Sequence, residues 1–157
     1  MKAVIVCVSV SHGNTQRIAE AMAEVLGARV VGPGDIDPAE LAACDLVGFG
    51  SGIFTMNFHP RLRELIATLP PQNGRKAFVF ATSGMPEPPF RRYIRSLTKL
   101  LIGRGYDVVD TFSCRGLDTW LPMRIVGGVS KGHPDAADVQ AARAFAEGLR
   151  DRVAARP

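Results

Sequence analysis

The chain has 157 residues, of which 46% are hydrophobic and 22% charged, and its net charge at pH 7 is +4. This length suits one globular domain, residues 1–157, and is too short for two ordinary domains. The longest apolar runs are far shorter than the roughly 20 residues of a membrane span. The basic charge is also not accompanied by a block of Lys and Arg or by an aromatic RNA-binding motif. We therefore expect a soluble protein that binds no nucleic acid.

The sulfur and imidazole side chains are few and widely spaced: Cys7, Cys44, Cys114, His12, His59 and His133. An odd number of cysteines without a C-x-x-C pair predicts neither a disulfide framework nor a zinc site. The histidines likewise lack metal-ligand spacing. We expect no bound metal and a reducing, cytoplasmic location.

Apolar runs alternate with segments of helical periodicity along the whole chain. The expected strands are residues 2–8, 28–31, 45–50, 77–81 and 107–113. The expected helices follow the first, third, fourth and fifth strands: one ends at Gly27, one runs from Pro60 to Pro70, and two cover about 90–102 and 135–155. A long loop, 51–59, joins the third strand to its helix. This alternation predicts an α/β fold, a doubly wound parallel sheet with helices on both faces.

The turn between the first strand and the first helix reads Ser9-Val10-Ser11-His12-Gly13-Asn14-Thr15. Backbone N–H groups at a helix start lack internal partners and lie at the positive end of the helix dipole, so they stabilise an anion. Gly13 lets the backbone approach that anion closely. The side chains that can add hydrogen bonds are Ser9, Ser11, Asn14 and Thr15. The turn thus predicts a phosphate site, with the alternative that Asn14 or Thr15 simply caps the helix.

Several families share a five-stranded doubly wound sheet, and the residues at the strand ends distinguish them. A receiver domain needs an aspartate at the end of the third strand, where this chain has Gly50-Ser51. A low-molecular-weight tyrosine phosphatase needs an arginine six residues after a loop cysteine, but Cys7 lies within the first strand and residue 13 is glycine. Neither the spaced glycines of a dinucleotide fingerprint nor a Walker A lysine follows the first strand.

Gly13-Asn14-Thr15 resembles the phosphate loop of the flavodoxin family, and segments 45–54, 82–84, 113–119 and 127–134 resemble one branch of short flavodoxin-like proteins. The resemblance implies a sheet of strand order 2-1-3-4-5, with FMN bound outside the edge between strands one and three. Val10 and His12 stand where the family motif has hydroxyl residues. His12 either replaces one hydroxyl through a ring nitrogen or lies on the surface.

The resemblance also implies which residues surround the FMN: Ser9, Ser11, His12, Gly13, Asn14, Thr15, Ser51, Gly52, Ile53, Phe54, Thr55, Met56, Asn57, Phe58, Thr82, Ser83, Gly84, Arg115, Gly116 and Trp120. Phe54, Phe58 and Trp120 are the candidates for stacking on the flavin ring, and a core position is the alternative for each phenylalanine. Cys114 beside Arg115 is either an activated thiol or a small apolar residue at a strand end. Because the flavin performs the redox step, we expect no catalytic side chain.

Three functions fit this resemblance. The first is an electron-transfer carrier that passes electrons to redox partner proteins. The second is an FMN-dependent oxidoreductase that acts on a quinone or oxidises protoporphyrinogen, and the third is a non-redox binding module of the same fold. The helix at 90–102 carries Arg91, Arg92, Arg95 and Lys99 opposite its apolar stripe. That face is either simply solvated or a docking patch for an acidic partner.

Overall fold

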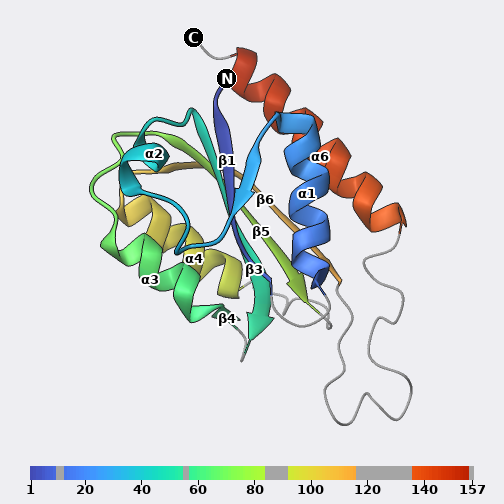
Figure 1. Cartoon of the computed structure of the whole chain (residues 1–157), viewed down its shortest axis with the longest axis horizontal. Coiled ribbons are helices and arrows are strands. Elements are labelled where there is room, and N and C mark those ends of the chain that lie inside the picture. Colours follow the sequence, from blue (N-terminus) through green and yellow to red (C-terminus); the bar gives the residue numbers. More distant parts are fainter. Residues whose placement is uncertain (10–12, 55–56, 84–91, 116–135, 156–157) are drawn as a thin grey trace.

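A computed structural model describes residues 1–9, 13–54, 57–83, 92–115 and 136–155. In spatial order the main sheet contains β2 (Arg29–Val31), β1 (Ala3–Val8), β3 (Leu46–Phe54), β5 (Lys76–Ser83) and β6 (Asp107–Arg115). The four pairings between these strands are parallel (Figure 1). A short strand, β4 (Asn57–Phe58), pairs antiparallel with the end of β3. With β4 set aside, this is the predicted order 2-1-3-4-5, so the doubly wound fold is confirmed.

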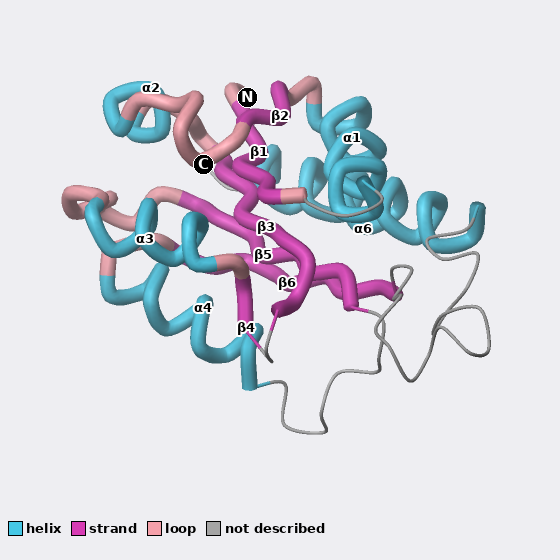
Figure 2. Tube along the Cα trace, turned by 60° about the horizontal axis from the view of Figure 1, so that its bottom comes forward, coloured by secondary structure: helices cyan, strands magenta, loops and turns pink. Residues whose placement is uncertain are grey.

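The helices form a layer on each face of the sheet. They are α1 (Asn14–Leu26), α2 (Pro38–Ala42), α3 (Pro60–Thr68), α4 (Arg92–Gly103) and α6 (Ala136–Ala155). Figure 2 shows α1 and α6 together on one face and α3 and α4 on the other. Within the described ranges, no helix combines the length and apolarity that crossing a membrane requires.

Alternate residues of β1 pack into two hydrophobic clusters, one on each face of the sheet. Val4, Val6 and Val8 join the cluster under α3 and α4, whereas Ile5 and Cys7 join the cluster under α1 and α6. The side chains that these helices contribute are Leu62 and Ile66 of α3, Leu97 and Leu101 of α4, Ile18 and Met22 of α1, and Leu149 of α6. Burial on both faces explains why the strands read as continuous apolar runs.

Glycines of β3 make room for the aromatic side chains of β5. Gly48 is in register with Phe78, and Gly50 with Phe80. A Cβ at either glycine would lie 2.4 or 2.3 Å from the Cζ atom of the facing ring. Both phenylalanines are fully buried and belong to the cluster under α1 and α6. The rings of β5 therefore lie over the β3 backbone, toward α1.

The segment after the third strand differs from the expected loop at 51–59. β3 continues to Phe54 and turns back into β4, and Ile53 pairs with Phe58. The third strand is therefore longer than predicted, because its polar and glycine-rich end still finds backbone partners in β5 and β4. The short helix α2 was also not predicted. It begins with Asp37, whose carboxylate accepts a hydrogen bond from the Ala39 amide at 2.9 Å.

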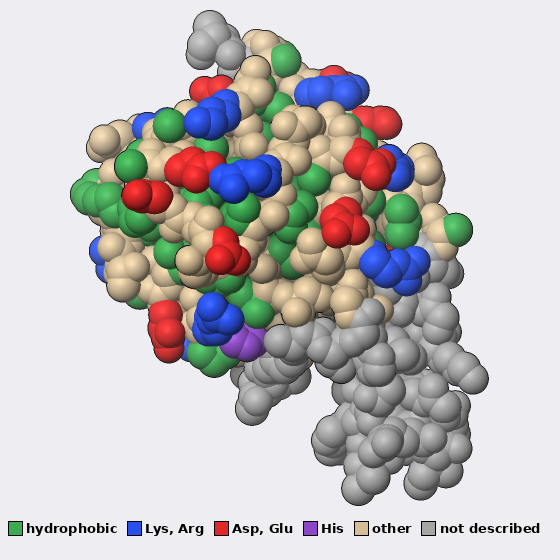
Figure 3. Space-filling model, viewed as in Figure 1, with side chains coloured by type: hydrophobic (Ala, Val, Ile, Leu, Met, Phe, Trp, Pro, Cys, Tyr) green, Lys and Arg blue, Asp and Glu red, His purple; other side chains and the backbone are tan. Residues whose placement is uncertain are grey.

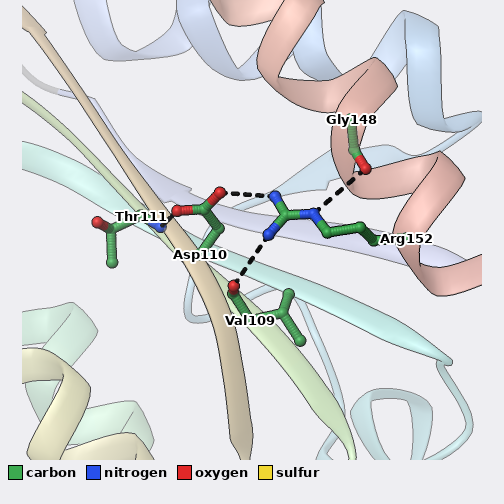
Figure 4. Close-up of polar contacts among 5 residues, drawn as sticks. All are labelled: Val109, Asp110, Thr111, Gly148 and Arg152. Atoms are coloured by element: carbon green, nitrogen blue, oxygen red, sulfur yellow. Dashed lines mark hydrogen bonds and ion pairs between the residues drawn. The ribbon is translucent and has the colours of Figure 1, made fainter.

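Helix α6 is tied to the edge strand β6 through one arginine (Figure 4). The guanidinium of Arg152 donates to the Asp110 carboxylate at 2.6 Å and to the carbonyl oxygens of Val109 and Gly148 at 3.4 Å each. Both charged side chains are nearly half exposed. The contact fixes the end of α6 against the sheet.

Candidate functional site

The carboxyl ends of β1, β3, β5 and β6 meet at one edge of the sheet. Val8 is in register with Ser51, Gly52 with Thr82, and Thr82 with Cys114. Parallel strands carry their ligand sites at this edge, outside the strand ends. The structure therefore brings together three of the segments that the sequence analysis selected.

Helix α1 begins at this edge, directly after β1. Gly13 has a left-handed backbone conformation, with φ of 66°, and a Cβ placed there meets no described atom within 4 Å. The first turn of α1, which the structure describes in full, carries no acidic side chain. The first backbone amides of a helix lack intrahelical partners, and a glycine before them leaves room for a ligand to approach. This geometry suits an anion.

Ser9 caps α1. Its hydroxyl oxygen accepts a hydrogen bond from the backbone amide of Gln16, the third residue of the helix, at 3.3 Å. Capping was an open alternative for Asn14 or Thr15, but the structure gives that contact to Ser9. The role is physically similar, because a side-chain oxygen satisfies one amide of the first turn.

Thr15 points toward the sheet. It is 3% exposed, and its hydroxyl lies 2.7 Å from the hydroxyl of Thr82, which is 4% exposed. This contact joins the first turn of α1 to the end of β5, two strands away from β1. Both residues were predicted to lie near the same ligand, but a direct bond between them was not predicted.

Ser51 holds the base of the β3–β4 hairpin. Its side chain is fully buried and donates to the carbonyl oxygen of Gly52 at 2.7 Å. The same hydroxyl oxygen accepts a hydrogen bond from the amide of His59 at 3.0 Å. His59 in turn caps α3, because its Nδ1 atom accepts a hydrogen bond from the Arg61 amide at 3.1 Å. These bonds fix both ends of the segment that was expected to line one side of the ring.

Phe58 lies in the hydrophobic core. It is fully buried, and its ring packs edge-on against Tyr93, with 6.1 Å between the ring centroids. Of the two roles considered for Phe58, the structure therefore favours the core position over stacking on a flavin. Phe54 is placed as the last residue of β3.

Cys114 is the residue before the last in the edge strand β6 and is half-buried against the cluster under α1 and α6. This packing favours the role of a small apolar residue at a strand end. Cys7 lies deeper in the same cluster, and burial, with a smaller contribution from Glu20, raises the pKa of its thiol to about 12. Among the described residues, no group of three or more His, Cys, Asp or Glu side chains is arranged to hold a metal ion.

Several predicted site residues lie outside the described part of the chain: Ser11, His12, Thr55, Met56, Gly84, Gly116 and Trp120. Ser83 and Arg115 are placed as the last residues of β5 and β6. The described members of the predicted set thus come from α1, β3, β4, β5 and β6, all at the same edge.

A groove of about 680 Å³ lies between α3 and α4, on the other face of the sheet from α1. Its lining includes Arg63 and Glu64 of α3, Lys99 and Leu100 of α4, and Asn57 of β4. Asn57 connects it to the β3–β4 hairpin. The basic face of α4 was predicted from the sequence, but the groove was not, because its walls come from separate helices of the chain.

The comparisons with known proteins agree with this architecture. A family model described as a flavodoxin domain matches residues 5–116. The chain is 32% identical over 151 residues to the uncharacterized protein MJ0298 of Methanocaldococcus jannaschii, which covers 95% of this chain and 98% of that protein.

Solved structures with the same fold include several flavodoxins. A flavodoxin from the domain Archaea has a TM-score of 0.71 at 18% identity and covers 98% of this chain and 99% of that one. Flavodoxin 2 from Bacillus cereus also has a TM-score of 0.71 at 18% identity, with 97% and 99% coverage. Rubredoxin oxygen:oxidoreductase from Desulfovibrio gigas, with a TM-score of 0.73 and 18% identity, matches 98% of this chain over 36% of its own length. Since the family model spans most of the chain and agrees with the observed fold, the protein belongs to the flavodoxin family.

Proposed function

We propose that the protein is an FMN-binding electron carrier whose cofactor lies at the carboxyl edge of β1, β3 and β5. FMN is the cofactor that membership of the flavodoxin family implies. The observation that carries the proposal is the start of α1, where an added Cβ on the left-handed Gly13 meets no described atom within 4 Å and the first helical turn carries no acidic side chain. A helix start of this kind stabilises an anion without a cationic side chain.

The described residues fit the phosphate of FMN. In this proposal the backbone amides of the first turn of α1 hold the phosphate, with Asn14 as a side-chain donor. Ser11 and His12 belong to the same proposed phosphate loop. Ser9 contributes indirectly, since its hydroxyl already caps the helix and keeps the turn in shape.

The flavin ring is proposed to lie against the β3–β4 hairpin and the ends of β5 and β6. The bound flavin supplies the redox chemistry, so no protein nucleophile or acid–base pair is needed. Ser51 keeps the hairpin in place through its two hydrogen bonds. The remaining residues proposed to line the ring are Gly52, Ile53, Phe54, Thr55, Met56, Asn57, Thr82, Ser83, Gly84, Arg115, Gly116 and Trp120.

The proposed redox partner is an acidic protein that docks over α3 and α4. Arg63 and Lys99 line the groove between these helices, and Arg95 is exposed on α4. Asn57 at the end of the groove belongs to the hairpin assigned to the flavin, so a docked partner would stand beside the cofactor. Figure 3 shows basic and acidic side chains interspersed across the face that it presents, so the docking proposal rests on these named residues rather than on a broad patch of one sign.

The three cysteines are free thiols, which suits a reducing compartment. We place the carrier in the cytoplasm on this basis.

Flavin titration of the purified apo-protein tests the proposal. Wild type should take up FMN with a shifted flavin spectrum, and Gly13→Val should lose this binding because a branched side chain fills the space assigned to the phosphate. Gly27→Val is the matched control, since Gly27 ends the same helix with nearly the same φ, 63°, and also has no described atom within 4 Å of an added Cβ. Both variants carry the same backbone strain, so loss of FMN binding in both, or in neither, would contradict the proposed site.

A further inference from the structure

The hydroxyl groups of Thr15 and Thr82 form a buried hydrogen bond between two elements that are far apart in the sequence, α1 and β5. Their oxygen atoms lie 2.7 Å apart, and both side chains are less than 5% exposed. Thr15 is the second residue of α1, directly after the turn assigned to the phosphate. Thr82 is the residue before the last in β5, and the segment assigned to the flavin ring follows this strand.

The packing of β3 against β5 explains how Thr82 reaches α1. Side chains alternate along a strand, so Thr82 shares the face of Phe78 and Phe80. Those rings lie over glycines of β3, and Thr82 is in register with the next glycine of the series, Gly52. With no side chain at this position of β3, the β5 residue has a clear path toward α1. The contact therefore follows from the alternation of side chains along β5 and from the glycines at the facing positions of β3.

We propose that Thr15 and Thr82 act as one positioning pair that couples the phosphate turn to the loop after β5. The proposal rests on the proposed function, because it concerns the geometry of the same cofactor site. In this arrangement the Thr15 hydroxyl is directed at β5, and its contribution to the phosphate is the orientation of the α1 amides. Thr82 likewise sets the end of β5, from which the segment assigned to the ring begins.

Because the two hydroxyls are hydrogen-bond partners, the effects of removing them on stability should not be additive. If one threonine becomes valine, the shape is kept but the other buried hydroxyl loses its partner, which carries the full cost of an unsatisfied buried polar group. If both become valine, no hydroxyl is left unpaired. The double variant should therefore be no worse than either single variant.

The first test uses the apo-protein, so it does not depend on flavin binding. Urea unfolding of wild type, Thr15→Val, Thr82→Val and the double variant gives a complete double-mutant cycle. Each single change should raise the unfolding equilibrium constant about tenfold, and the double change should raise it no further. Thr15→Ser keeps the hydroxyl and should stay close to wild type. If the two substitutions had additive effects on the free energy of unfolding, the proposed pair would be wrong.

The second test compares FMN with riboflavin, which lacks the phosphate, at a temperature where all variants are folded. A positioning pair predicts that Thr15→Val and Thr82→Val each weaken riboflavin binding about tenfold and FMN binding by at least as much, because FMN also depends on the orientation of the α1 amides. The double variant should again match the single variants. A phosphate ligand at Thr15 predicts instead that FMN affinity falls while riboflavin affinity is unchanged. A merely structural role predicts lower stability with both affinities intact.

These outcomes separate the two proposals. If wild type binds neither flavin, the proposed function fails, while the unfolding cycle still decides whether the two hydroxyls act together. If wild type binds FMN but the riboflavin affinity of Thr15→Val equals that of wild type, the positioning pair fails and the proposed function stands.

Discussion

The ring of Phe80 in β5 lies directly over the backbone of Gly50 in β3, so closely that a Cβ on Gly50 would stand 2.3 Å from the ring carbon Cζ. Phe80 is fully buried among side chains under α1 and α6 and has no free direction in which to move. The glycine at this position is therefore required by packing.

Gly50→Ala should lower the free energy of unfolding by about 3 kcal/mol, the upper end of the usual cost of overpacking. Combining it with Phe80→Leu should recover part of this loss, because the smaller side chain removes the clash. Gly103→Ala is the control, since a Cβ there meets no described atom within 4 Å. Urea denaturation measures all four proteins. An unchanged midpoint for Gly50→Ala would contradict the observed packing.

The buried thiol of Cys7 should make stability depend on pH above 9. Its pKa is raised from 9.0 to about 12 in the folded protein, mainly by burial. Below pH 9 the thiol is protonated in both the folded and the unfolded state, so its contribution to the free energy of unfolding is fully present. Between pH 9 and 12 only the unfolded state releases the proton, so stability should fall by up to about 1.4 kcal/mol per pH unit.

Urea unfolding between pH 8 and about 10.5 checks this expectation. Cys7→Ala should show a shallower decline than wild type, whereas Val6→Ala, a truncation in the same strand, should be less stable but keep the wild-type slope. The remaining decline in Cys7→Ala is expected partly from Tyr106, whose pKa burial raises to about 12. Equal slopes in wild type and Cys7→Ala would show that Cys7 does not carry the effect.

The contact between Arg152 and Asp110 at the edge of the sheet should contribute modestly to the stability of the fold. Since both partners are nearly half exposed, solvent screens the ion pair, and Asp110→Asn should cost no more than about 0.5 kcal/mol. Arg152→Met also removes the bonds to Val109 and Gly148 and should cost about 1 kcal/mol. Thermal unfolding at low salt and at high salt, with Arg150→Met as the control, measures the difference. A loss that is independent of salt for Asp110→Asn would contradict an electrostatic origin.

Charge reversal on α4 tests the proposed docking surface. Arg95→Glu combined with Lys99→Glu should slow electron transfer to an acidic redox protein about tenfold or more at low ionic strength. The difference should shrink at high salt, where surface charges are screened. The control combines Lys2→Glu with Arg150→Glu, which makes the same change in net charge away from α3 and α4. Equal rates for the two double variants would leave α4 as an ordinary solvated face.

Much of the fold was predictable because local patterns decide it. Continuous apolar runs such as Ala3–Val8 predict strands buried on both faces, and that strand is buried throughout. Gly27, with φ of 63°, ends α1 where the sequence placed its end. The short helix α2 and the hairpin of β3 with β4 were not predicted. The first is too short for a periodic signal, and the second depends on Ser51 bonding a residue eight positions away.

The expected chemistry of the site comes from the sequence by itself, because the turn at Gly13 joins an apolar strand to a helix and the start of a helix stabilises an anion. Tertiary structure alone decided which side chain does what. Ser9 rather than Asn14 or Thr15 caps α1, and Phe58 lies in the core. Thr15 meets Thr82 across 67 residues of sequence. Such assignments depend on strand register and on which elements pack together, and neither is encoded within a short stretch of chain.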